Sequence, residues 1–208
     1  METREGTLDD FIVKEVKSYL NKFKEFKDTD VVLDLWGNIW AFTALIAPKV
    51  SKVITFEPDE ENFSLLLNNT KEFNNVIPLK EAVVWNDDTT RSFFLNTKTN
   101  KGSHSFLVQR WRDEVTVSCV NFNTILEEYK PNKIKMDIEG WEYELLTTAI
   151  DLSFIDEIVI EYHFNALRDK DKTKYKEVIE ILKNHFKNVE YKEDTKKAWC
   201  TIITANNY

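Results

Sequence analysis

The sequence predicts an α/β fold with one doubly wound, mainly parallel sheet and helices on both of its faces. Short apolar runs, of the kind expected for strands that are buried on both sides, alternate with segments of helical periodicity. Only four glycines and four prolines occur in 208 residues, so the chain offers few turns and no low-complexity linker. No internal repeat or domain boundary is found. We therefore expect one domain, in which a core at 31–208 follows a leading helical segment at 1–30.

The predicted elements follow one another in a regular order. Apolar residues at helical spacing predict an amphipathic helix over 7–27. The first strands are expected at 31–35, 52–58 and 76–84. The helices between them are expected at 41–50, interrupted near Pro48, and at 59–73, with Asp59 as the N-cap. The second half predicts an antiparallel insertion at 91–97 and 114–121 around a polar loop at 98–105, helices at 122–129, 142–150 and 175–186, and strands at 133–138, 157–162, 188–193 and 198–205.

The charge and the cysteines restrict the class of protein. A formal charge of −8 disfavours a broad nucleic-acid-binding face, because lysine and arginine dominate phosphate binding. Cys119 and Cys200 each lie in a strand-like run, so we expect reduced thiols. The N-terminal residues do not resemble a signal peptide, and no apolar window is long enough to span a bilayer. We expect a cytoplasmic protein without a nucleic-acid partner or a membrane span.

The segment from Asp34 to Trp40, followed by Glu57, has the spacing of a nucleoside-binding unit. It would form a strand, a tight loop, a helix and an acid at the end of the next strand, where a carboxylate can accept hydrogen bonds from ribose hydroxyls. The alternative for Glu57 is a solvated carboxylate at the end of a strand. The spacing does not separate a dinucleotide from S-adenosylmethionine. The absence of Gly-x-Gly-x-x-Gly disfavours a nicotinamide-dependent oxidoreductase.

Several short motifs together resemble the FkbM family of methyltransferases. They are Val32-Leu33-Asp34, Gly37-Asn38, Phe56-Glu57-Pro58 with Asn62, and the run from Lys135 to Glu142, in which Lys-x-Asp-x-Glu-Gly-x-Glu is the most specific part. The likeness extends in order from about residue 31 to residue 163. It implies a Rossmann-like class I methyltransferase fold, S-adenosylmethionine as donor, and usually a hydroxyl acceptor on a sugar or natural product. Family members also occur fused to glycosyltransferases, so the chain is compatible with an excised module whose partner is a glycosyltransferase.

The resemblance implies a donor site in the loop after the first strand and beside it. The expected cofactor-binding residues are Asp34, Trp36, Gly37, Asn38 and Glu57, with Glu81 and Ala82 close to the adenine. The loop departs from the family pattern Asp-x-Gly-x-Asn-x-Gly, because Trp36 and Trp40 take the two glycine positions. Three alternatives stay open. The indoles point away while the loop takes another path, they stack on the adenosine, or they fill the pocket and abolish cofactor binding.

Three residues are candidates for the base that a hydroxyl acceptor requires. Asp137 and Glu139 follow the fourth main strand, and their alternation places both on one side of an extended chain. Two carboxylates this close could form a base or together hold a divalent cation; alternatively, one of them bonds only loop backbone. Glu161 and His163 end the fifth strand near the same crevice, and a histidine titrates near neutrality. No cluster of histidine and cysteine has zinc spacing, so no metal site is predicted.

These observations lead to two hypotheses. The first is an S-adenosylmethionine-dependent O-methyltransferase that acts on a sugar hydroxyl of a glycan or glycoconjugate. The second is a catalytically disabled methyltransferase fold that binds a glycan or a protein partner. It is motivated by Trp36 and Trp40.

Overall fold

The main sheet has the mixed topology of a doubly wound α/β protein. The computed structural model describes residues 2–96, 104, 113–164, 172–192 and 200–208. Seven strands lie in the order β3-β2-β1-β7-β8-β10-β9. They are β1 (Val31–Leu35), β2 (Lys52–Phe56), β3 (Val76–Leu79), β7 (Lys133–Met136), β8 (Glu157–His163), β9 (Asn188–Glu190) and β10 (Cys200–Asn206). All neighbouring pairs from β3 to β8 are parallel, and β10 is antiparallel to both β8 and β9. The predicted α/β class and mainly parallel sheet are confirmed.

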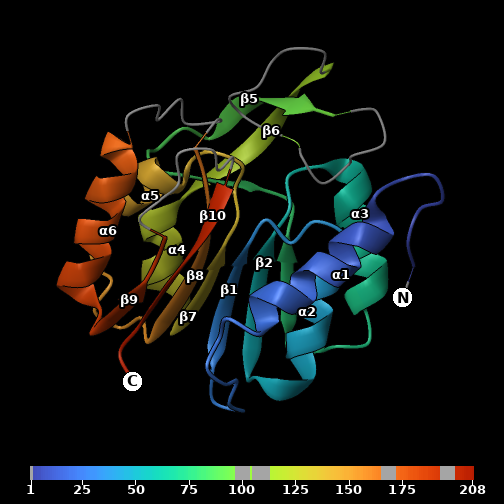
Figure 1. The fold of residues 1–208 in the computed structure, drawn as a ribbon. Helices are drawn as coiled ribbons and strands as arrows, with labels where there is room; N and C mark the ends of the chain where they lie inside the picture. Colours follow the sequence, from blue (N-terminus) through green and yellow to red (C-terminus); the bar gives the residue numbers. More distant parts are fainter. Residues whose placement is uncertain (1, 97–103, 105–112, 165–171, 193–199) are drawn as a thin grey trace.

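Helices cover both faces of this sheet (Figure 1). One side carries α1 (Asp9–Leu20), α2 (Ala41–Ile46) and α3 (Glu60–Thr70), and the other carries α4 (Phe122–Tyr129), α5 (Glu142–Thr148) and α6 (Thr173–His185). Successive strand residues serve opposite faces: Val32 belongs to the core under α1 and α2, whereas Leu33 belongs to the core under α4 to α6. This explains why the parallel strands are apolar at almost every position.

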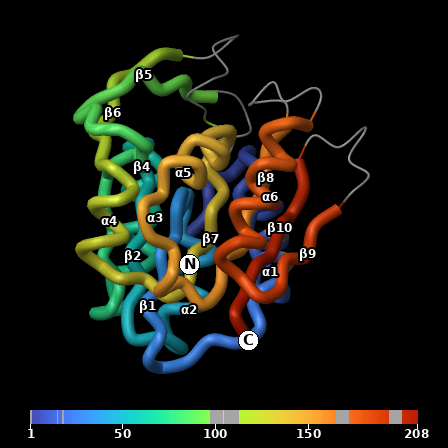
Figure 2. The backbone as a smooth tube through the Cα atoms, turned by 90° about the vertical axis from the view of Figure 1, so that its left-hand side faces the viewer, coloured from blue at the N-terminus to red at the C-terminus, as the bar shows by residue number. Residues whose placement is uncertain are grey.

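A small second sheet corrects one predicted strand. The apolar run at 76–84 forms two strands, because β3 pairs with β2 while β4 (Ala82–Val84) leaves the main sheet and pairs with β6. Both halves of the run are apolar, so periodicity alone could not show the change of partner. The sheet has the order β4-β6-β5, with β5 (Thr90–Leu95) and β6 (Asp113–Asn121) antiparallel as predicted. In Figures 1 and 2, β5 and β6 lie beyond the edge at which the parallel strands end.

The leading helix is shorter than predicted, because α1 ends at Leu20 and not near residue 27. The apolar residues beyond it pack as an irregular segment: the Phe23 ring lies 5.0 Å from Phe26 and 5.7 Å from Phe42. The Lys24 backbone N–H donates to Glu157 Oε1 at 2.8 Å and holds this segment at the start of β8. Apolar residues at helical spacing therefore continue beyond Leu20, although the helix itself ends there.

Several local predictions are confirmed. Asp59 is the N-cap of α3, and its carboxylate accepts the Asn62 backbone N–H at 2.9 Å. Pro48 lies in a single 3₁₀ turn, η1 (Ala47–Lys49), that ends the second helix. Neither Cys119 nor Cys200 forms a disulfide within the described residues. The polar loop predicted at 98–105 lies outside the described residues except for residue 104. Among the helices that the structure describes, none combines the length and the apolarity that a bilayer crossing needs.

Candidate active site

The loop between β1 and α2 follows the backbone path of a glycine loop although it carries two tryptophans. Trp36 has φ 77° and Trp40 has φ 115°, in the region that favours glycine. The backbone N–H groups of Trp36 and Gly37 donate to the Phe56 carbonyl at 3.0 and 2.8 Å, which fixes the loop on β2. A bulky residue at positive φ costs of order 1–3 kcal/mol. The loop thus holds both tryptophans at backbone angles that favour glycine.

Close approach explains why Gly37 remains a glycine. A Cβ at this position would overlap the hydroxyl oxygen of Thr55, on β2. That hydroxyl and the Thr43 hydroxyl both face Asp34, and Thr43 Oγ1 donates to Asp34 Oδ2 at 2.7 Å. Asp34 is itself fully buried, so it orders the base of the loop.

The two indoles lie in different places. Trp36 is 5% exposed, and its ring packs edge-on against Phe93 of β5 with the centroids 5.4 Å apart. Trp40 is 2% exposed and packs in the core under α1 and α2, where its Nε1 donates to the Glu2 carbonyl at 3.1 Å. Only Trp36 of the two is among the residues that line the pocket described below. Trp36 is thus the indole that borders the predicted donor site.

Glu57 ends β2 as predicted, but its carboxylate is enclosed. It is 0% exposed, and its two oxygens accept the backbone N–H groups of Asn38 and Asp59, each at 2.9 Å. Burial raises the pKa of Glu57 to about 8, against the opposing effect of these hydrogen bonds. Glu81 is partly buried, and Ala82 is buried at the start of β4. In this conformation Glu57 offers no open oxygen to a ribose.

A pocket of about 140 Å³ lies at the carboxyl ends of β1, β7 and β8. Its polar wall consists of Asn38, Lys135, Asp137, Glu139 and Glu161, and α1 supplies an apolar wall that includes Phe11. Pockets for small molecules usually measure roughly 300–1,000 Å³. As far as the described residues define it, this pocket is smaller than that range. Trp36 forms part of the wall of this pocket.

The structure brings the three candidate bases together. His163 Nε2 lies 3.9 Å from Asp137 Oδ1 and 3.9 Å from Glu139 Oε2. Asp137 and Glu139 line the pocket, whereas His163 lies beside it. Glu139 departs from the extended conformation that the alternation predicted, because β7 ends at Met136 and Glu139 has φ 52°. A turn, and not an extended strand, thus directs both carboxylates to the cavity.

Burial shifts the pKa values of the titratable groups in this cluster. Burial raises the pKa of Asp137, and Lys135 opposes the rise. Burial also raises the pKa of Glu139 to about 8, with His163 opposing. For His163, burial lowers the pKa, but the neighbouring carboxylates, first Glu142 and then Glu139 and Asp137, together hold it well above 6.5. Perturbed titratable groups of this kind concentrate at functional sites.

Lys135 is also a site residue, although the sequence analysis named it only as the start of the family-like run. Its Nζ donates to the Trp36 carbonyl at 2.9 Å and lies 3.3 Å from Asp34 Oδ1 and 3.7 Å from Asp137 Oδ2. Burial lowers the pKa of Lys135, but Asp34 and Asp137 outweigh this effect and raise it. The position of Lys135 in the most specific family motif was a signal that could have identified it.

Glu142 and Glu161 complete the cluster. Glu142 begins α5, is fully buried, and accepts the Gly140 backbone N–H at 3.1 Å. Its Oε1 also lies 2.9 Å from His163 Nδ1. Glu161 accepts the Tyr19 hydroxyl through Oε2 and the Cys200 thiol, at 2.8 Å, through Oε1. Sequence reasoning placed Glu161 near the crevice, but the buried Glu142–His163 contact had no signal in spacing, because it joins a helix start to a distant strand end.

Comparison with known proteins gives the family and the fold. The family model of the methyltransferase FkbM domain matches residues 25–191. The hexuronic acid methyltransferase AglP of Haloferax volcanii is 26% identical over 156 residues, which cover 73% of this chain and 63% of that protein. The match thus spans less than two thirds of the relative's length.

Solved structures share the fold at low identity. The crystal structure of a fibrillarin/Nop5p complex has a TM-score of 0.56 at 17% identity, covering 93% of this chain and 81% of that chain. A dimethyladenosine transferase from Plasmodium falciparum has a TM-score of 0.54 at 12% identity, covering 95% of this chain and 61% of that one. These likenesses confirm the predicted Rossmann-like fold. Because the family model matches most of its residues, this chain belongs to the FkbM family of methyltransferases.

Proposed function

We propose that this chain transfers a methyl group from S-adenosylmethionine to a sugar hydroxyl of a glycan or glycoconjugate. The observation that carries the proposal is the pocket at the carboxyl ends of β7 and β8, into which Asp137 and Glu139 face. Ligands of open α/β sheets bind at this edge. Family membership supports methyl transfer, and the relative named for hexuronic acid supports a sugar acceptor.

The pocket offers two candidate bases for a hydroxyl acceptor. A neutral alcohol is a weak nucleophile, so a base must take its proton as the new bond forms. Asp137 and Glu139 are the carboxylates in the pocket that follow β7, and a hydroxyl bound there would lie against them. Since methyl transfer depends mainly on alignment, the turn after β7 that directs both carboxylates to the pocket favours this assignment.

The donor side would be formed by the loop after β1 and by Glu57. S-adenosylmethionine supplies the methyl group when it is bound. Asp34, Gly37, Asn38 and Glu57 would hold it, with Glu81 and Ala82 at the adenine. Asn38 supports this placement, because its Oδ1 is buried beside the pocket and has no hydrogen-bond partner among the described residues.

The acceptor assignment is tested by Asp137→Asn and Glu139→Gln, each assayed for radiolabelled methyl transfer to a panel of glycans. General bases typically contribute 10²–10⁴-fold, so we expect a loss of at least about 100-fold in kcat from the variant that lacks the base. Glu144→Gln, on the same segment but paired with Lys174, is the matched control and should retain full turnover. Full turnover in both Asp137→Asn and Glu139→Gln would refute the base assignment.

A disabled methyltransferase fold is the second candidate, and the closed donor site favours it. Trp36 packs against Phe93, and Glu57 has no exposed surface. Calorimetric titration with S-adenosylhomocysteine, repeated on Trp36→Gly/Trp40→Gly, separates the two candidates. Binding by the unaltered chain means that the indole moves aside. Binding only by the double variant means that the tryptophans block the site.

The remaining proposals concern the setting of the chain. We propose one methyltransferase module over 1–208 that works in the cytoplasm and cooperates with a glycosyltransferase, fused or separate. The sugar acceptor supports this pairing, since glycosyltransferases produce the glycans to be methylated. Cell fractionation followed by affinity purification tests it: recovery in a cytoplasmic fraction together with a glycosyltransferase is expected, and recovery elsewhere contradicts it.

A further inference from the structure

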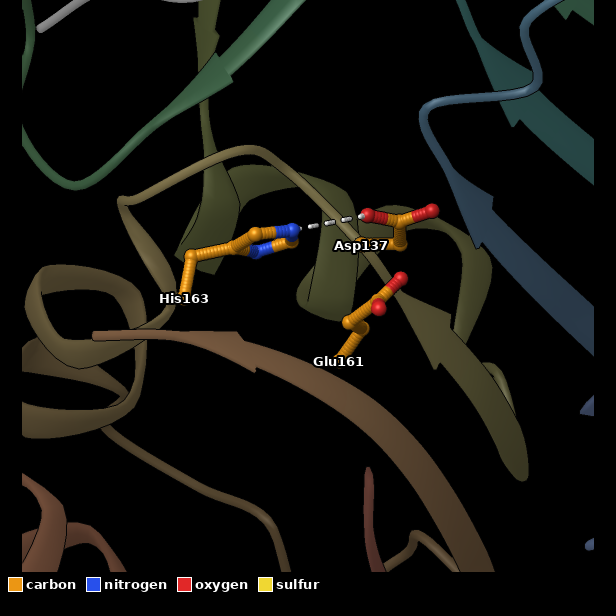
Figure 3. A group of neighbouring side chains, drawn as sticks. All are labelled: Asp137, Glu161 and His163. Carbon is orange, nitrogen blue, oxygen red and sulfur yellow. Dashed lines mark ion pairs between the residues drawn. The ribbon is translucent and has the colours of Figure 1, made fainter. Parts of the chain in front are cut away.

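A group of three side chains at the ends of β7 and β8 has the arrangement of a metal site. One ligand atom from each of Asp137, Glu161 and His163 lies within 4.8 Å of those of the other two. Figure 3 shows their side chains directed at one another, Asp137 from the end of β7 and the other two from β8. Glu161 and His163 are two residues apart on a strand, so they share one side of the sheet.

The orientation of His163 is an independent indication of a ligand. The residue is 9% exposed, and its Nδ1 is held 2.9 Å from the fully buried Glu142 carboxylate. Nδ1–H therefore donates to Glu142, and Nε2 is directed at the cluster. Within the described residues Nε2 makes no hydrogen bond, because its neighbouring oxygens on Asp137 and Glu139 are both 3.9 Å away. Metal-bound histidines almost always show this carboxylate contact on the other ring nitrogen.

The net charge of the cluster also favours a cation. Four carboxylates (Asp137, Glu139, Glu142 and Glu161) surround His163, and Lys135 is shared with Asp34. A cation held between ionised carboxylates is attracted by each of them. The hydrogen bonds from Tyr19 and Cys200 to Glu161 orient this carboxylate but supply no positive charge.

We propose that Asp137, Glu161 and His163 bind one divalent cation, with Mn²⁺ as the best match. Oxygen and nitrogen ligands lie about 2.0–2.6 Å from such ions, so ligands on opposite sides of one ion are about 4–5 Å apart, which fits the observed spacing. Carboxylates favour Mg²⁺, Ca²⁺ and Mn²⁺, while imidazole favours transition metals. Mn²⁺ satisfies both preferences.

The ion would give Asp137 and Glu139 different roles in the reaction. This part of the inference rests on the proposed function. Asp137 and Glu161 line the same pocket as Glu139, so an ion between them is within reach of an acceptor hydroxyl. A bound cation lowers the pKa of an oxygen ligand. The bound ion would lower the pKa of an acceptor hydroxyl, Glu139 would take the proton of that hydroxyl, and Asp137 would serve as an ion ligand and not as the base.

Mn²⁺ binding to the full chain, without cofactor or acceptor, tests the inference. Electron paramagnetic resonance of a Mn²⁺ titration gives the stoichiometry and Kd, and electron spin-echo modulation detects a coordinated ¹⁴N nucleus. We expect one ion per chain with nitrogen modulation that His163→Ala abolishes. Asp137→Asn, at a partly exposed side chain, should weaken binding by at least about 100-fold, and Glu142→Gln by about 10–100-fold through misorientation of His163.

The controls decide between a built site and general attraction to acidic residues. Glu144→Gln removes a nearby carboxylate outside the cluster and should leave Kd within about twofold, and circular dichroism verifies that each variant is folded. Absence of binding, an unchanged Kd in Asp137→Asn, or binding without nitrogen modulation would overturn the inference. Because the measurement contains neither donor nor acceptor, it stands or falls separately from methyl transfer.

Discussion

Trp36→Gly should loosen the fold and open the donor site. The strain at φ 77° is relieved by about 1–3 kcal/mol, but a buried aromatic truncated in a core costs about 3–5 kcal/mol. The free energy of unfolding should therefore fall by about 2 kcal/mol. A tryptophan buries about 150–250 Å², so displacing this indole from its contacts costs a ligand on the order of 4 kcal/mol. Its removal should tighten S-adenosylhomocysteine binding by at least about 100-fold.

Trp40→Gly is the matched control for this prediction. It removes the same side chain from the same loop, also at positive φ, but Trp40 packs under α1 and α2 and does not line the pocket. We expect a comparable loss of stability in urea denaturation and no gain of affinity in calorimetry. Equal S-adenosylhomocysteine affinity in the unaltered chain and in Trp36→Gly would refute the idea that this indole closes the site. An equal gain in both single variants would show that loosening of the loop, and not removal of bulk, admits the ligand.

Three further changes test other parts of the structure. Glu57 has a folded pKa near 8 against 4.5 unfolded, so it contributes stability that is complete below pH 4.5 and lost as pH rises to 8. Urea midpoints should fall over pH 5–8, and Glu57→Gln should flatten that slope by up to about 1.4 kcal/mol per unit. Gly37→Ala should cost at least about 1–3 kcal/mol in the same assay, since its Cβ overlaps the Thr55 hydroxyl. Lys133→Ala leaves the buried Glu157 carboxylate, 2.7 Å from Nζ, without this partner and should lower the free energy of unfolding by about 3–5 kcal/mol; an unchanged thermal midpoint would contradict this.

The fold could be predicted from the sequence wherever residues within an element mark where that element begins and ends. Strands such as β1 and β2 are short apolar runs with polar ends, and Asp59 marks the start of α3 by its side chain. Prediction failed where the apolar pattern continues beyond the end of the helix or strand. The apolar spacing past Leu20 continues although the helix stops, and the run at 76–84 changes partner between β3 and β4. Periodicity reports which side chains are buried, but not which neighbour buries them.

The candidate site shows the same limit at the level of single residues. Spacing and family likeness indicated that Asp137, Glu139 and His163 would lie near one crevice. His163 Nε2 indeed lies 3.9 Å from one carboxylate oxygen of each of the other two residues. Neither signal could show that Glu142 holds the other ring nitrogen, because that contact depends on the packing of α5 against β8. The loop gave the reverse case: the sequence showed that two glycines were missing, but only the backbone shows that Trp36 retains a glycine conformation.

Lys135 connects the loop after β1 with the carboxylates after β7. This contact bears on the choice between an active methyltransferase and a disabled one. Its ammonium group donates to the Trp36 carbonyl and lies 3.7 Å from Asp137 Oδ2, so it contacts both the loop after β1 and the carboxylates after β7. A fold that had lost methyl transfer would not need this cluster, in which burial disfavours the ionised carboxylates of Asp137 and Glu139. The strain at Trp36 likewise costs free energy while the indole stays buried. Both costs fall on residues that Lys135 contacts, so under the proposed function the loop moves when the donor binds, whereas a loop that has ceased to bind the donor gives no reason for either cost.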